Sequence, residues 1–416
     1  MTAIAVPDMM AHVRFLSERF PRRHTGEPQE REAALYVADT LRAYGLDVQV
    51  QEIPIMGWEL AESASLRVLA PEEREIEMIP FIFSGSTPVD GLEGELVRVG
   101  PTLVVGISPP WEKYALVDPG TGQWRAYVVG RTNGPAITQS GPPAGSAGTE
   151  DGPHYTWPSC VIGVADLRRI QEWLAAGQRV RVRLSIQSRY KPGQLSYLVE
   201  GVLRGRTRPD EAIVIGAHHD CQGAMGFPTE FTVPGACDNA SGVAAVLEMA
   251  RYYREEGFPQ SLWFVTFGGE EWNLTISRDY VRTLVETGRR EHLLAAIILD
   301  QFANGEILKF ICSGDEEHLS PRFDMAGTVR AVVTELGLAG RFPVEFVVPP
   351  ARGSDHWPFY VAGIPSLLTA WDPIPHYHRQ GDRVEACNRD DKFEAALSAV
   401  QATLQRLGDS PPGLVL

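Results

Sequence analysis

The sequence predicts an α/β fold in which a mostly parallel, mixed sheet is sandwiched by helices and carries an inserted β-rich module. Three observations lead to this prediction. After Gly193, apolar strand-like runs alternate with helical patterns along the chain. Some of these runs, such as residues 261–267, are almost continuously apolar, which is typical of strands covered on both faces. Between residues 58 and 190, short β-like runs are separated by Gly and Pro clusters.

The elements expected in chain order divide the protein into two domains. Residues 28–45 place apolar side chains at helical spacing and end in a glycine, so we expect a helix there and a strand over 47–55. We assign residues 1–57 and 191–416 to one domain, and residues 58–190 to the inserted β-rich domain. One helix is expected inside the insertion, over residues 165–177.

In the larger domain the strand and helix patterns alternate. Apolar runs predict strands over 197–205, 212–220, 261–269, 295–302 and 364–371. Helical periodicity predicts helices over 241–257, 281–288, 323–337 and 391–408. This alternation is the pattern of a parallel sheet whose connections are helices.

Composition excludes several classes of protein. The 416 residues contain 38 Lys and Arg against 53 Asp and Glu, a net charge of −15, which argues against nucleic acid or an anionic membrane as partner. No apolar run approaches the ~18 residues of a membrane-spanning helix. The N-terminus lacks a basic stretch followed by an apolar one, so we expect no signal peptide and a cytoplasmic location.

The cysteines are few and are never arranged as C-x-x-C. They are Cys160, Cys221, Cys237, Cys312 and Cys387. An odd number of sparse cysteines predicts a reducing compartment and no disulfide framework. We therefore expect Cys221 and Cys237 to pack as small apolar side chains.

Ionisable side chains follow the predicted strands at the points where the strands end. They are His218, His219 and Asp220; Glu270 and Glu271; Asp300; and His376, Tyr377 and His378. Asp238 lies just before a predicted helix. Ligand sites of open α/β sheets form outside the carboxyl ends of the strands, so we expect these groups to converge. Imidazoles with several carboxylates and no thiolate suit Zn²⁺, with Co²⁺ or Mn²⁺ as competitors.

Each of these residues, taken alone, has a simpler interpretation. Asp238 can precede a helix-capping Asn239, Asp300 can occupy a turn after a strand, and a Glu-Glu pair is usually solvated. The occurrence of the whole set in one domain favours a metal site over these separate explanations.

Six short motifs also occur in a distinctive order. They are H-x-D at 218–220, G-A-x-D-N-A-S-G at 235–242, E-E at 270–271, L-D at 299–300, S-D-H at 354–356 and Y-H at 377–378. Their order and spacing resemble the zinc exopeptidases of the M28 aminopeptidase family. The resemblance extends to residues 8–56 and implies the zinc-exopeptidase, phosphorylase-like fold. The insertion lies where some members carry a protease-associated domain.

The resemblance implies a centre of two zinc ions. His218 and Asp300 would bind one ion, Glu271 and His378 the other, and Asp238 would bridge them. The adjacent histidines compete for these roles: the spacing to Asp220 favours His218 over His219, and the Tyr-His order favours His378 over His376.

The resemblance also implies the catalytic roles. Glu270 would be the general base, which takes a proton from the water molecule between the metals and passes it to the leaving amine. Tyr377 would donate a hydrogen bond to the oxyanion, and Asp220 would orient His218. Ser354, Asp355 and His356 would support the site.

The function implied is that of a dinuclear zinc exopeptidase, most simply an aminopeptidase that acts on peptides. Carboxypeptidases and glutaminyl cyclases of related fold remain alternatives, and Arg352 and Arg379 are candidate clamps for a substrate carboxylate. A non-catalytic binding protein is disfavoured because Glu270 and Asp238 are both present. An oligomer stays possible.

Overall fold

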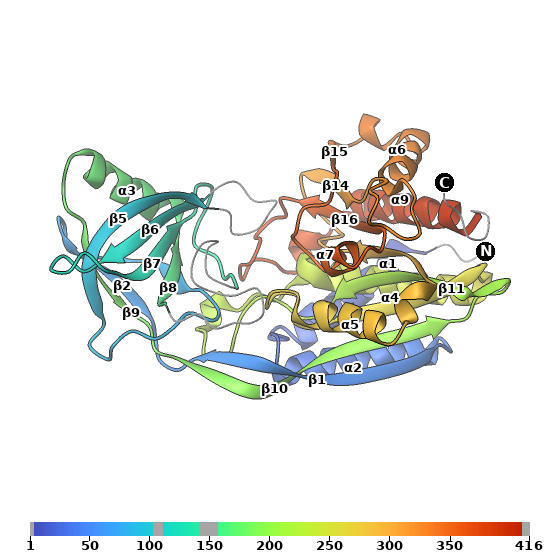
Figure 1. Ribbon diagram of the computed structural model, residues 1–416, viewed down its shortest axis with the longest axis horizontal. Helices are drawn as coiled ribbons and strands as arrows, with labels where there is room; N and C mark the ends of the chain where they lie inside the picture. The colour runs from blue at the N-terminus through green and yellow to red at the C-terminus, as the bar shows by residue number, and fades with distance from the viewer. Residues whose placement is uncertain (1–3, 103–110, 141–156, 410–416) are drawn as a thin grey trace. The chain divides into compact units, whose positions relative to one another are not determined.

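The computed structural model describes residues 4–102, 111–140 and 157–409, and these form two compact units (Figure 1). The first unit takes its residues from Met1–Ile53, Leu195–Cys221 and Val233–Leu416, and the second from Pro54–Gln194 and Gln222–Thr232. Strands β1 (Asp47–Leu60) and β10 (Ser188–Leu203) run through both units. The predicted domain boundaries, at residues 57 and 191, fall within these two strands.

The sheet of the first unit has eight strands in the order β1-β10-β12-β11-β13-β16-β14-β15. The bounds not yet given are β11 (Arg208–His218), β12 (Gln260–Phe267), β13 (Leu293–Leu299), β14 (Ile307–Cys312), β15 (Val344–Val347) and β16 (Ser366–Asp372). The four central strands β12, β11, β13 and β16 are parallel, whereas β10 and β14 pair antiparallel with β12 and β16. The predicted mostly parallel, mixed sheet is confirmed.

Helices cover both faces of this sheet. Alternate residues of β11, Ile213, Ile215 and Ala217, belong to the core that also contains α1 (Val6–Arg19), α2 (Pro28–Ala43), α4 (Ser241–Glu256), α6 (Met325–Glu335) and α9 (Asp390–Asp409). On the other face the ring of Phe267 lies 5.8 Å from Tyr280 of α5 (Thr275–Glu286) and 6.4 Å from Phe359 of α7 (His356–Val361), measured between ring centroids. Side chains of a strand alternate between the two faces of a sheet, so these strands are buried on both faces.

Helix α2 forms where the apolar spacing predicts it. Proline occupies its first turn, where no intrahelical donor is lost, and Gly45 follows its end with a φ of +84°. The face that meets the core is made of small and medium apolar side chains: Ala33, Ala34, Val37, Ala38 and Leu41. The predicted helix is confirmed to within two residues of its end.

Strands β14 and β15 were not expected from the sequence. A lysine, Lys309, interrupts the apolar run of β14, and such a residue normally indicates exposure. Here Lys309 is buried. Its charge is compensated by two carboxylates, that of Asp372 on β16 at 2.7 Å and that of Glu345 on β15 at 3.5 Å. The ion pairs span the three adjacent strands, and no local pattern indicates such a pairing.

The second unit contains a separate sheet, with the order β3-β2-β9-β5-β6-β7-β8-β4. Its strands are β2 (Ser65–Ala70), β3 (Arg74–Ile76), β4 (Met78–Pro80), β5 (Leu92–Thr102), β6 (Trp111–Val117), β7 (Trp124–Gly130), β8 (Ser159–Ile162) and β9 (Arg181–Ser185). All pairs in it are antiparallel except β7 with β8. Helix α3 (Val164–Ala175) buries Leu167 against β7, where a Cβ on Gly130 would lie 2.5 Å from that leucine. Among the residues described in both units, no helix is long and apolar enough to cross a membrane.

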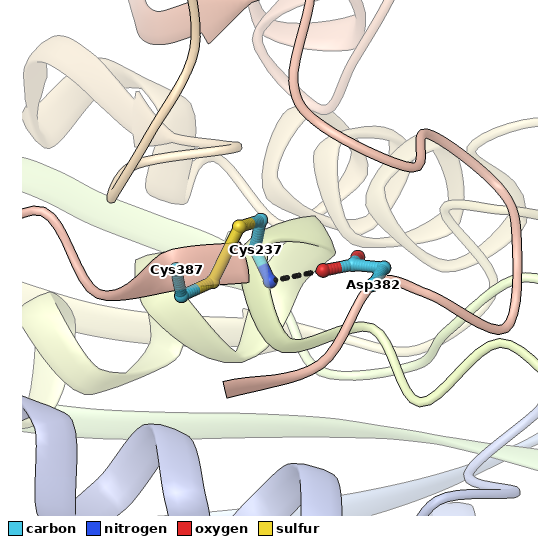
Figure 2. Close-up of side chains that lie close together, drawn as sticks. All are labelled: Cys237, Asp382 and Cys387. Atoms are coloured by element: carbon cyan, nitrogen blue, oxygen red, sulfur yellow. Dashed lines mark hydrogen bonds between the residues drawn. A yellow bond between two sulfur atoms is a disulfide. The ribbon is translucent and has the colours of Figure 1, made fainter. Parts of the chain in front are cut away.

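The expectation that no cysteines are linked is wrong. Cys237 and Cys387 form a disulfide between residues separated by 150 positions, and Figure 2 shows it beside Asp382. Cys387 belongs to the short helix α8 (Val384–Cys387). The pairing has no local sequence pattern because the fold alone brings the two segments together. The other three cysteines are free and buried, and the inference of a reducing compartment loses its basis.

The close approach of Gly268 to Glu30 gives a first testable prediction. A Cβ at Gly268 would lie 2.0 Å from Glu30 Oε1 and 2.4 Å from Ser196 Oγ, which are hydrogen-bonded to each other at 2.5 Å. We expect Gly268→Ala to lower the free energy of unfolding by about 1–3 kcal/mol, the usual cost of overpacking. Urea unfolding measures this. Gly340→Ala is the control, because its Cβ would meet nothing within 4 Å; equal effects of the two variants would contradict the prediction.

Candidate functional site

The predicted site residues converge at one edge of the first unit's sheet. His218 is the last residue of β11, Glu270 and Glu271 follow β12, and Asp300 directly follows β13. Because these strands are parallel, their carboxyl ends meet at the same edge. Asp238 comes from the turn before α4, where Gly235 has a φ of +60° and a Cβ would lie 2.3 Å from the carbonyl oxygen of Asp238.

The carboxylate of Asp238 lies between two imidazoles. Its Oδ1 is 3.3 Å from His218 Nε2, and its Oδ2 is 3.4 Å from His378 Nε2. A second carboxylate approaches each imidazole: Asp300 Oδ1 lies 3.3 Å from His218, and Glu271 Oε2 lies 3.4 Å from His378. The geometry is thus two imidazole–carboxylate pairs that share one carboxylate. It is a suitable donor arrangement for two cations.

Glu270 lies at the same edge but in a different relation to the imidazoles. Its Oε2 is 4.0 Å from His218 Nε2, farther than the carboxylates of Asp238 and Asp300. Burial raises the pKa of Glu270 well above its usual value, and Asp300 and Asp355 raise it further against the opposing effect of His218. A carboxyl group with a raised pKa is a better proton acceptor than an exposed one.

The cluster buries more negative than positive charge. Burial raises the pKa of Glu271 well above its usual value, with further contributions from Asp238 and Glu270. Burial also raises the pKa of Asp355, to about 7. At His218 burial acts to lower the pKa, but the surrounding carboxylates raise it well above the usual value. A divalent cation would offset this excess, and imidazoles with carboxylates are donors that such cations bind, so the residues fit a metal centre.

His218 is oriented from behind. Its Nδ1 faces Asp220 Oδ1 at 3.4 Å, while Asp220 Oδ2 accepts hydrogen bonds from Thr25 Oγ1 at 2.7 Å and from the Glu271 amide at 3.3 Å. All of these groups except the Glu271 amide belong to side chains that are fully buried. This arrangement turns Nε2 of His218 toward Asp238 and Asp300, the orientation that ligating imidazoles normally receive from an outer carboxylate.

Three other histidines lie outside the cluster. His219 Nδ1 is 3.1 Å from Thr266 Oγ1, and His356 Nε2 is 3.0 Å from the carbonyl oxygen of Ala351. Burial lowers the pKa of both imidazoles to about 4. His376 is exposed.

The S-D-H motif contacts the cluster through its serine. Ser354 Oγ donates a hydrogen bond to Asp300 Oδ2 at 2.7 Å, which leaves Asp300 Oδ1 facing His218. Asp355 contributes charge near Glu270. The motif therefore positions one carboxylate and raises the pKa of another.

Tyr377 stacks on His378, with ring centroids 3.7 Å apart and the ring planes at 23°. Burial raises the pKa of its phenol well above the usual value, and Asp238 and Glu271 raise it further. The phenol therefore stays protonated and can donate a hydrogen bond.

Arg23 and Asp382 are among the buried residues of the site that escaped sequence analysis. Arg23 donates hydrogen bonds to the carbonyl oxygens of His219 at 2.9 Å and Gly235 at 2.5 Å, and also to that of Pro234. Asp382 accepts hydrogen bonds from the backbone amides of Cys237 and Asp238. Both act on backbone groups of other segments, so no motif around them could have indicated their role.

The two arginines that the sequence offers for binding a substrate carboxylate are more exposed than the residues of the cluster. Arg352 is exposed and Arg379 is half-buried. Neither belongs to the cluster of His218, Asp238 and His378.

With this geometry established, comparisons identify the family. The model of peptidase family M28 matches residues 199–402. A "Probable zinc metalloprotease" of Pyrenophora tritici-repentis (strain Pt-1C-BFP) is 26% identical over 216 residues, 46% of this chain and 49% of that protein. "Aminopeptidase YwaD" of Bacillus subtilis (strain 168) is 23% identical over 413 residues, 90% of this chain and 79% of that protein.

A solved structure, the "Peptidase M28 precursor" of Shewanella amazonensis SB2B, has a TM-score of 0.72 at 18% identity and covers 98% of this chain and 94% of its own. The fold prediction is therefore confirmed. Peptidase family M28, whose model matches residues 199–402, is the family that the order of the motifs predicted. The chain spans about half the length of the Pyrenophora relative.

The hydrogen bond from Ser354 to Asp300 gives a second prediction. Ser354→Ala removes a buried donor from a carboxylate, so we expect the free energy of unfolding of chelator-treated protein to fall by about 1.5–3 kcal/mol. Thr328→Ala is the control, because its hydroxyl bonds an exposed carbonyl oxygen of Asp324 at 3.0 Å. Denaturant unfolding that gives the same loss for both variants would show that the buried bond contributes nothing specific.

Proposed function

We propose that this chain is a zinc-dependent aminopeptidase with a centre of two metal ions. The observation that carries the proposal is the carboxylate of Asp238, with one oxygen directed to His218 and the other to His378 at 3.3 and 3.4 Å. The names of the relatives support zinc and aminopeptidase activity. His218 and Asp300 are proposed to hold one ion and His378 and Glu271 the other.

The ions, when bound, would polarise the scissile carbonyl and acidify a water molecule. Glu270 is proposed as the general base, because it lies beside the ligand set without approaching an imidazole as closely as Asp238 or Asp300 does. It accepts a proton from the attacking water and returns it to the nitrogen of the leaving peptide. Since its carboxylate is buried, little solvent competes for that proton.

Tyr377 completes the proposed catalytic set. Its protonated phenol can donate a hydrogen bond to the oxygen that becomes negative as the carbonyl is attacked, an interaction that strengthens as charge develops. Stacking on His378 fixes the position of the ring. The excess of buried carboxylates at this edge also favours a substrate that presents a positive amino terminus over one that presents a carboxylate.

The specificity for amino ends is tested with matched peptides. We expect hydrolysis of a peptide with a free amino end, retained cleavage when its carboxyl end is amidated, and no cleavage when its amino end is acetylated. Chromatography of the products reports each result. Cleavage of the acetylated peptide together with loss of cleavage on amidation would replace the aminopeptidase with a carboxypeptidase.

Glu270→Gln tests the base. The amide cannot accept the proton but occupies nearly the same space, so we expect kcat to fall by about 10²–10⁴-fold while the zinc content stays at that of the unaltered protein. Steady-state kinetics and elemental analysis measure the two quantities. Glu317→Gln, at an exposed carboxylate, is the control. Normal turnover by the Glu270 variant would remove this residue from the mechanism.

A further inference from the structure

The segment after His378 is fastened to the turn that carries Asp238. Figure 2 shows the two attachments together, the disulfide between Cys237 and Cys387 and the carboxylate of Asp382. His378 precedes both attachments on one segment, and Asp238 directly follows Cys237 on the other. Two of the proposed metal-binding side chains therefore lie on segments that are joined beside them.

Asp382 forms the polar attachment. Its Oδ1 accepts a hydrogen bond from the amide of Cys237 at 2.7 Å, and its Oδ2 accepts one from the amide of Asp238 at 3.0 Å. Its own carbonyl oxygen accepts from the amide of Ala236 at 3.3 Å. Asp382 is fully buried, so no water replaces these bonds. Three successive amides of the turn are thus held by one residue that lies four positions after His378.

The disulfide forms the covalent attachment. Cys237 and Cys387 are both fully buried, and their Cα atoms are 5.3 Å apart. The bond links the residue next to Asp238 with helix α8, nine positions beyond His378. If the hydrogen bonds of Asp382 break, the disulfide still limits how far Asp238 and His378 can separate.

We propose that Asp382 and the Cys237–Cys387 disulfide are positioning elements that hold Asp238 against His378, and that reduction of the disulfide weakens zinc binding at this centre. This inference rests on the proposed function. Metal affinity depends steeply on ligand placement, and loss of an outer contact typically costs 10–100-fold. Affinity for zinc would thereby depend on the redox state of the protein.

The redox step needs only an external dithiol. One thiolate of the dithiol attacks one sulfur of the Cys237–Cys387 bond, forms a mixed disulfide with that cysteine and expels the other cysteine as a thiolate. The second thiolate of the dithiol then attacks the mixed disulfide and expels the first cysteine. The dithiol ends as its own disulfide, and Cys237 and Cys387 end as two thiols that have gained two electrons and two protons. Both sulfurs are buried, so the exchange requires local opening of the protein around them.

The test measures zinc affinity rather than activity. Chelator-stripped protein is titrated with zinc against a chromophoric competitor, before and after dithiothreitol treatment and anaerobic removal of the reagent. We expect the reduced protein and the Cys387→Ala variant to bind at least one zinc ion about 10–100-fold more weakly than the oxidised protein. Cys312→Ala, which removes a free buried thiol of β14, is the control and should bind normally.

A second pair of variants separates the polar attachment from the covalent one. Asp382→Asn loses one acceptor oxygen, and we expect a similar weakening of zinc binding with the disulfide intact. Asp324→Asn is its matched control. Asp324 also accepts a hydrogen bond from a backbone amide, that of Gly327 at 2.8 Å, but it caps α6 at an exposed position. Circular dichroism before titration establishes that each variant is folded, and the reduced unaltered protein provides the measurement if Cys387→Ala does not fold.

The outcomes distinguish this inference from the proposed function. Alkylation of the denatured, unreduced protein should modify three cysteines, and modification of all five would overturn the inference. Equal zinc affinities of the oxidised and reduced protein, both binding two ions, would also overturn it and leave the proposed function standing. Failure of the oxidised, unaltered protein to bind zinc would overturn the proposed function itself.

Discussion

The concentration of buried carboxylates at one edge of the sheet is the constraint on which the rest of the first unit depends. Asp220, Asp238, Glu271, Asp300 and Asp355 are all buried there. Carboxylates that are packed together without water repel one another and need compensating charge or hydrogen bonds. The protein supplies imidazoles, hydroxyl groups and backbone amides from distant parts of the chain, and the remaining excess of charge is what makes the place suitable for divalent cations.

The residues at this edge come from two kinds of backbone, the ends of parallel strands and irregular turns. The parallel strands β11, β12 and β13 deliver their polar residues to one edge, and burial of both faces keeps these strands in register. Asp238 and His378 come instead from irregular segments, whose backbone has no ladder to fix it. These two segments are the ones fastened by Arg23, Asp382 and the disulfide.

The same division explains how much could be predicted from the sequence. Apolar runs, helical spacing and the ordered motifs predicted the mixed sheet, the central strands and α2, because each depends on neighbouring residues. The ordered motifs also named the imidazoles and carboxylates that lie around Asp238, and their metal-binding roles stay proposals. The contacts of Arg23, the ion pairs of Lys309 and the Cys237–Cys387 pair could not be predicted, since each depends on segments that only the fold brings together. The cysteine count was misleading because an odd total does not prevent one pair.

The hydrogen bonds of Arg23 show which segments the first unit needs in order to fold. The guanidinium group joins the carbonyl oxygen at the end of β11 to two carbonyl oxygens of the turn before Asp238, although it lies outside the span that the family model matches. Thr25 and Glu30 enter from the same region. Residues 23–30 are therefore an integral part of the first unit, and a fragment that begins at residue 199 would leave those three carbonyl groups without their donor. The span that the family model matches is therefore smaller than the unit whose residues must fold together.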